Sequence, residues 1–167
     1  TNSLAFQSAI VVDGKRPSVV DVASDGSVSP DGTYKLGDTV DIEVKFDELI
    51  TVTGVPKLEL ETGETDGLAV LKAGSDTTSV DELTFVYTVG AGHESSDLDA
   101  FALVLGGGDA IRDAAGNDAV LSLPSGSDTN SLAFQSAIVV DGKRPSVVDV
   151  ASDGSVSPDG TYKLGDT

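Results

Sequence analysis

The sequence predicts an all-β protein, a two-layer sandwich of antiparallel strands, and three observations carry this prediction. Apolar and polar residues alternate over several short segments, which is the period of strands that bury one face. Turn dipeptides such as Asp25-Gly26 and Asp66-Gly67 separate these segments. No segment has a strong helical period. Roughly seven to nine short strands over about 125 residues are typical of a two-sheet antiparallel sandwich.

The two clearest strands are Val40–Phe46 and Leu83–Val89, in which apolar side chains occupy every second position. In the first of them Asp41, Glu43 and Lys45 fill the other positions, and we expect these three residues to face water. Asp97–Leu105 has a weak helical period and is expected to be a strand or a single turn. The shorter candidate strands, in chain order, are Ser18–Ala23, Lys57–Glu61, Leu68–Lys72, Phe101–Leu105, Ala119–Leu123 and Ala137–Val140.

The chain contains a long internal repeat. Residues 1–39 and 129–167 are identical at every position, so the repeat period is 128 residues. This period is far longer than the roughly 20–50 residues of solenoid units, and it corresponds to a whole domain. We therefore expect a tandem repeat protein, represented here by one full repeat and part of another.

Short polar segments mark the joints between repeats. Asp13–Pro17 ends in a proline that cannot donate to a β-ladder, and the same five residues recur at Asp141–Pro145. The predicted organisation is a last strand of a preceding repeat plus linker (1–16), a complete repeat (17–141), and a linker with the first strands of the next repeat (142–167). The expected partners are neighbouring identical repeats, joined in tandem or by strand exchange between chains.

Composition excludes several functional classes. The chain carries 28 Asp and Glu residues against 10 Lys and Arg, a net charge of −18, which disfavours nucleic acid and anionic membrane surfaces as partners. Without Cys there is no disulfide framework and no thiol nucleophile. No apolar run approaches the ~18 residues that span a bilayer. The sequence has no Met either, so we expect it to be a piece of a longer protein.

Five segments carry a family resemblance. They are GTYKLGDTVDIEVKFDE (32–48), GVPKLELETG (54–63), LTFVYTVGAG (83–92), IRDAAGND (111–118) and AIVVDGKRPSVV (137–148). In this order and spacing they resemble the bacterial immunoglobulin-like and cadherin-like repeats of giant surface proteins and adhesins. The resemblance implies an immunoglobulin-like sandwich, often loaded with calcium, in a tandem array outside the cell at its surface.

The residues themselves also suggest a cation site. In an immunoglobulin-type sandwich the loop after the second strand and the loop before the last strand lie at the pole where the chain enters, because successive strands reverse direction. Acidic residues occur in both loops and in the linker. Ca²⁺ takes about six to eight oxygen ligands, so such a cluster would suit it. The predicted ligands are Asp13, Glu48, Asp113, Asn117, Asp118 and, in the second linker, Asp141.

Other interpretations of these residues remain open. Asp113 and Asn117 could instead shape a turn around Gly116. Asp47 and Glu48 could be solvated surface acids, and Asp25 and Asp31 are expected to form turns. If the stretch from Ala119 to Asp141 holds two strands, Asp113 moves to the opposite pole.

Two functional classes are consistent with the sequence. The first is a structural repeat, a spacer or filament-forming unit whose joints are stiffened by Ca²⁺. The alternative is an adhesive module that recognises a glycan or a partner cell, although the chain has no Trp and few aromatic residues for sugar stacking. We expect no enzymatic activity, because the single His93 has no nucleophile or second ligand to work with.

Overall fold

The computed structural model describes residues 12–151 and Leu164, and all structural statements below concern these residues. This part of the chain is all-β, with one short helix. The elements in chain order are β1 (Val19–Ser24), β2 (Gly32–Lys35), β3 (Thr39–Thr53), β4 (Lys57–Leu60), β5 (Gly67–Leu71), β6 (Thr78–Thr88), β7 (Glu94–Ser95), β8 (Ala100–Val104), β9 (Ala110–Arg112), α1 (Leu132–Gln135) and β10 (Ile138–Asp141).

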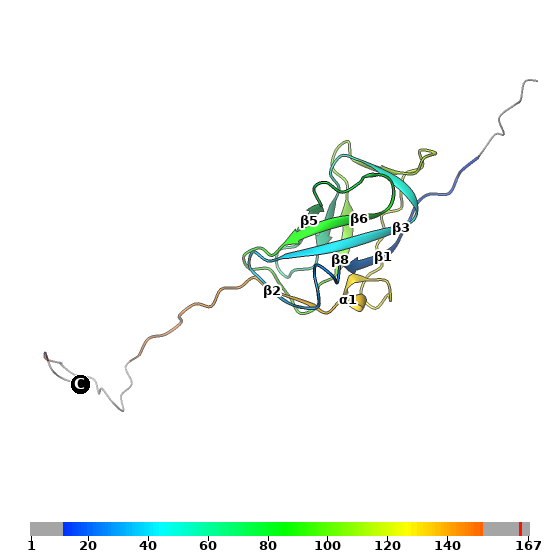
Figure 1. Cartoon of the computed structure of the whole chain (residues 1–167). Coiled ribbons are helices and arrows are strands. Elements are labelled where there is room, and N and C mark those ends of the chain that lie inside the picture. The colour runs from blue at the N-terminus through cyan, green and yellow to red at the C-terminus, as the bar shows by residue number, and fades with distance from the viewer. Residues whose placement is uncertain (1–11, 152–163, 165–167) are drawn as a thin grey trace, which may run out of the picture.

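The strands form two sheets (Figure 1). A seven-stranded sheet has the order β1-β3-β6-β5-β4-β8, with β9 paired to β3, and all its pairings are antiparallel. A three-stranded sheet has the order β2-β10-β7, in which β10 runs parallel to β2 and antiparallel to β7. The long strand β3 pairs with three others and occupies a central position in the larger sheet.

One hydrophobic core is shared by both sheets. Ile42 of β3, Leu58 of β4 and Phe85 of β6 are fully buried in it, and so is Ile138 of β10. The core is mostly aliphatic, as expected from a chain with three Tyr, five Phe and no Trp. Strands from both sheets therefore contribute side chains to the same core.

Most of the predicted strands are present, and Ala119–Leu123 is the exception. Val120 forms a single parallel bridge with Ser18, and the Ala119 amide donates to the Ile111 carbonyl at 2.9 Å. These two residues therefore bond to different neighbours, and no continuous ladder with one partner forms. The prediction of a strand here was wrong.

The expectation that the chain has no helix also needs correction, because α1 forms one turn. Ser131 is its N-cap, and the Ser131 hydroxyl oxygen accepts a hydrogen bond from the Phe134 amide at 3.3 Å. Leu132 anchors the turn in the core. Among the described residues, no helix has the length and apolar character needed to cross a membrane.

Asp41 differs from the expectation that it faces water. It lies on the polar side of β3, yet only 5% of it is exposed. The Lys72 ammonium covers it, with Nζ 2.6 Å from Asp41 Oδ2, and the Asp41 amide donates to the Ser29 hydroxyl at 2.8 Å. Burial is tolerated here because the carboxylate has a cationic partner.

The two ends of the domain lie at opposite poles. Figure 1 shows the segment before β1 leaving the domain on one side and the segment after β10 leaving on the other. Strand β3 runs between these poles, with its first half beside β1 and its last residues beside β9. A chain that enters at one pole and leaves at the other can continue into further domains.

Candidate metal centre

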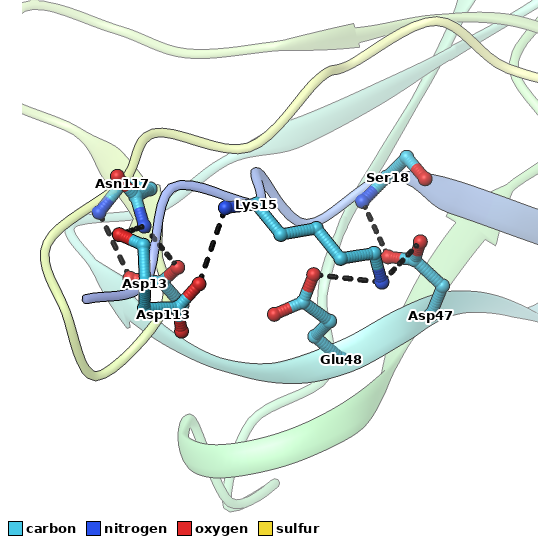
Figure 2. A network of polar contacts seen from close by, with 7 residues as sticks. All are labelled: Asp13, Lys15, Ser18, Asp47, Glu48, Asp113 and Asn117. Atoms are coloured by element: carbon cyan, nitrogen blue, oxygen red, sulfur yellow. Dashed lines mark hydrogen bonds and ion pairs between the residues drawn. The ribbon is translucent and has the colours of Figure 1, made fainter. Parts of the chain in front are cut away.

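Three acidic residues far apart in the sequence meet at the pole where the chain enters. Asp13 lies before β1, Glu48 lies in β3, and Asp113 directly follows β9. One carboxylate oxygen of each lies within 4.8 Å of the others. Figure 2 shows the three side chains beside one another. The three carboxylates expected at one pole therefore lie close together, but Glu48 is not in the loop where it was expected, because β3 continues through it to Thr53.

A wide irregularity in β3 positions Glu48. Between Lys45 and Ile50 the pairing of β3 with β6 shifts: Lys45 pairs with Glu82 and Ile50 pairs with Val80, so β3 has more residues in this interval than β6 has. Such a bulge turns side chains away from the regular alternation of a strand. Asp47 is held here by β1, because its Oδ1 atom accepts the Ser18 amide at 2.7 Å and its own amide donates to the Ser18 carbonyl at 3.0 Å.

A tight turn after β9 positions Asp113. Its Oδ1 atom accepts the Asn117 amide at 2.8 Å, and the Gly116 amide donates to the Asp113 carbonyl at 3.2 Å. Gly116 has a φ of 93°, a left-handed conformation that favours glycine. Asp113 and Asn117 thus do shape a turn, which was one of the two interpretations left open. The second Asp113 oxygen also accepts the Asn117 side-chain amide, and these bonds hold the pKa of Asp113 below its ordinary value.

Asn117 ties the linker to this turn. Its Nδ2 atom donates to Asp113 Oδ2 at 2.7 Å and to the backbone carbonyl of Asp13 at 3.2 Å. In this arrangement the Asn117 side-chain amide positions Asp113 and the linker beside each other. The Asp13 carboxylate itself accepts the Lys15 amide at 3.1 Å.

Lys15 supplies the positive charge beside the cluster. Its Nζ atom lies 2.8 Å from Glu48 Oε1 and 3.0 Å from Asp47 Oδ2. Glu48, followed by Asp47, raises the pKa of Lys15. The pKa of Asp47 is lowered, mainly by the Ser18 amide and then by Lys15. This role of Lys15 was not predicted, since its only sequence signal is a cationic residue two positions after Asp13.

Glu48 Oε1 is buried, and its partner among the described residues is the Lys15 ammonium, whose Nζ atom lies 2.8 Å away. Buried carboxylate oxygens normally have such partners. The carboxylates of Asp13, Glu48 and Asp113 together form an all-oxygen donor set, the type that hard divalent cations take.

Two predicted ligands lie outside this group. The Asp118 carboxylate pairs with Arg112, whose Nε atom is 2.6 Å from Asp118 Oδ1. Asp141 is the last residue of β10, and its Oδ1 atom accepts the Lys143 amide at 3.2 Å. Since β10 leads out of the opposite pole (Figure 1), Asp141 cannot join Glu48 and Asp113 of the same domain.

The remaining residues considered in the sequence form hydrogen bonds within the domain, away from the acidic cluster. Asp25 Oδ1 accepts the Ser27 amide at 3.0 Å within a turn, as predicted, while Asp31 Oδ1 accepts the Ala137 amide at 2.8 Å and ties its loop to the segment before β10. His93 Nδ1 lies 2.8 Å from the hydroxyl of Tyr87, and burial raises the pKa of Tyr87 to about 12.

Comparisons with protein-family models, characterised proteins and solved structures returned no match. The interpretation of the site therefore depends on its own geometry.

Proposed function

We propose that this chain is a structural repeat, a spacer or filament-forming unit, of an extracellular bacterial surface protein or adhesin. In this proposal each repeat is an immunoglobulin-like sandwich, and Ca²⁺ bound at each joint stiffens the array. The observation that carries it is the meeting of Asp13, Glu48 and Asp113, because one of these acids belongs to the linker and two belong to the domain.

The spacer role is supported by the repeat and by the shape of the domain. Identical segments recur with a period of 128 residues, which matches a chain built from copies of one domain. The chain enters the sandwich at one pole and leaves at the other (Figure 1), so successive copies extend the array lengthwise. A strongly acidic surface keeps such copies soluble and apart from one another.

Asp13, Glu48 and Asp113 would hold the ion. A divalent cation offsets the repulsion among three clustered carboxylates better than the single charge of Lys15 does. Binding would fasten the linker to the domain, because it engages Asp13 together with residues of β3 and of the turn after β9. The Asn117 side chain and the Lys15 amide hold Asp113 and Asp13 in place.

Calcium titration of the chain tests this proposal. We expect binding with a Kd of about 10⁻⁴–10⁻³ M, the range of extracellular modules. Glu48→Gln keeps the side-chain size and removes a ligand charge, so it should weaken binding at least about tenfold, which corresponds to ~1.4 kcal/mol. Isothermal titration calorimetry measures this change.

Asp47→Asn is the matched control for that experiment. It also removes one negative charge next to Lys15, but Asp47 is outside the three-carboxylate group. Its effect on calcium affinity should be clearly smaller than that of Glu48→Gln. Equal losses in the two variants, or no calcium binding to the unsubstituted chain, would refute the proposed site.

A further inference from the structure

The two copies of the linker contact two different poles of the domain. In the second copy Gly142 continues from β10 and lies against the loop before β7. Its amide donates to the His93 carbonyl at 2.7 Å, and its carbonyl accepts the Gly92 amide at 3.2 Å. Lys143 forms an ion pair with Glu94. This copy shows how a linker leaves a repeat.

The close packing of Gly142 requires a glycine. A Cβ atom at this position would lie 2.2 Å from the Gly90 carbonyl oxygen, well inside contact distance. At the equivalent Gly14 the same added atom meets nothing within 4 Å. The glycine of the linker is therefore required by the domain that precedes it and not by the domain that follows.

The first copy shows how a linker enters a repeat. Lys15 pairs with Asp47 and Glu48, as described above. Arg16 Nε donates to the Asp118 carbonyl at 2.7 Å, and Pro17 is buried against the domain. These contacts fasten the linker to the domain that follows, and they involve different atoms from those that Gly142 uses.

From these two sets of linker contacts we propose that consecutive repeats meet directly, without a flexible spacer, and that the linker lysine joins them. Since the linkers are identical in sequence, a linker between two complete repeats can make both sets of contacts. Its lysine then lies between Glu94 of the preceding repeat and Asp47 and Glu48 of the following one. The inference rests on the tandem arrangement proposed above, but it needs no metal ion.

The length of the linker supports a direct contact. Asp141 belongs to β10 of one repeat, and its equivalent Asp13 belongs to the acidic cluster of the next. Four residues separate this aspartate from the serine that bonds to Asp47, and they span at most about 18 Å. Within that length both ends are anchored, so the two domains have little freedom to rotate.

Distance measurement between spin labels tests the joint. The chain is lengthened by one further 128-residue period, and Glu82, which is exposed on β6, is replaced by Cys in both repeats. The native sequence has no Cys, so only these two sites are labelled. In the presence of a chelator we expect one narrow distance distribution by double electron–electron resonance.

Substitutions in the linker between the two repeats should broaden that distribution. Gly142→Ala displaces the linker from the preceding repeat, and Lys143→Gln removes the charge shared by the two domains. Lys57→Gln, an equivalent change of an exposed lysine on β4, is the matched control and should leave the distribution unchanged.

The outcomes separate this inference from the calcium proposal. A broad distribution in the unsubstituted chain, with or without calcium, would overturn the direct joint while leaving calcium binding to a single repeat intact. A narrow distribution that both linker substitutions leave unaltered would also overturn it. If the chain does not bind calcium, but the distance distribution is narrow and broadens in the Gly142→Ala and Lys143→Gln variants, the direct joint is supported and the calcium site is refuted.

Discussion

Residues 17–23 and 145–151 have the same sequence and different structures. The first segment contributes β1, where Val22 is fully buried, whereas the equivalent Val150 is 87% exposed and its segment forms no strand among the described residues. The two segments differ in whether a partner strand is available to pair with them. Strand β1 pairs with β3 from Val19 to Ser24, and the β3 sequence from residue 40 onward occurs once in the chain. A strand therefore depends on its partner more than on its own residues.

The largest expected effect tests the burial of this segment. Val22→Ala removes two methyl groups from a fully packed site, so it should lower the free energy of unfolding by about 2–3 kcal/mol. The same change at Val150 removes exposed methyl groups and should shift it by less than about 0.5 kcal/mol. Urea denaturation measures both variants. Similar losses at the two positions would mean that the second copy also docks against the domain.

An intermediate effect is expected at the glycines of the two linkers. Gly142→Ala forces a Cβ atom against the Gly90 carbonyl, so overpacking should cost about 1–2 kcal/mol. Gly14→Ala has open space around it and should be close to neutral. Thermal unfolding of the two variants compares them directly. A destabilisation of the same size in Gly14→Ala would show that the first linker is packed as closely as the second.

The smallest effect is expected at the linker lysines, and it depends on pH. The pKa of Lys15 is raised, so its contribution to stability is complete below about 10.5 and is lost as the pH rises above that value. The pKa of Asp47 is lowered, so its contribution is present above about 3.8 and is lost as the pH falls below it. Between these limits Lys15→Gln should lower the melting temperature slightly more than Lys143→Gln, because Lys15 pairs with two acids and Lys143 with one.

High salt provides the control for the lysine comparison. At 1 M ionic strength the Debye length falls to about 3 Å, so the difference between Lys15→Gln and Lys143→Gln should shrink. A difference that stays constant from low to high salt, or that is largest at acidic pH, would argue that the lysine acts through packing of its methylene groups instead of its charge.

The long strands were predictable from the sequence, and three of the short ones were not. Strands β3 and β6 alternate over enough residues to show their period, and both were expected. Strands β2, β7 and β9 have only two to four residues, too few for a pattern, and they form by pairing with β10 or with β3. The single turn of α1 was missed for the same reason.

The candidate site also has features that the sequence predicts and features that it does not. The reversal of successive strands predicts that Glu48 and Asp113 share a pole, but it does not show that β3 continues through Glu48 to Thr53. The roles of Lys15, Asn117 and the bulge in β3 do not follow from it, because they depend on where side chains point after the strands have paired.

By itself the sequence determined the fold class, the period of the repeat and the excess of acid, because alternation, identity and charge are properties of residues in order. Only the tertiary structure decided which of two identical segments becomes a strand, and which acids gather around the linker. The physical reason is that burial and pairing are relations between distant segments, so the same residues have different energies at the two ends of one domain.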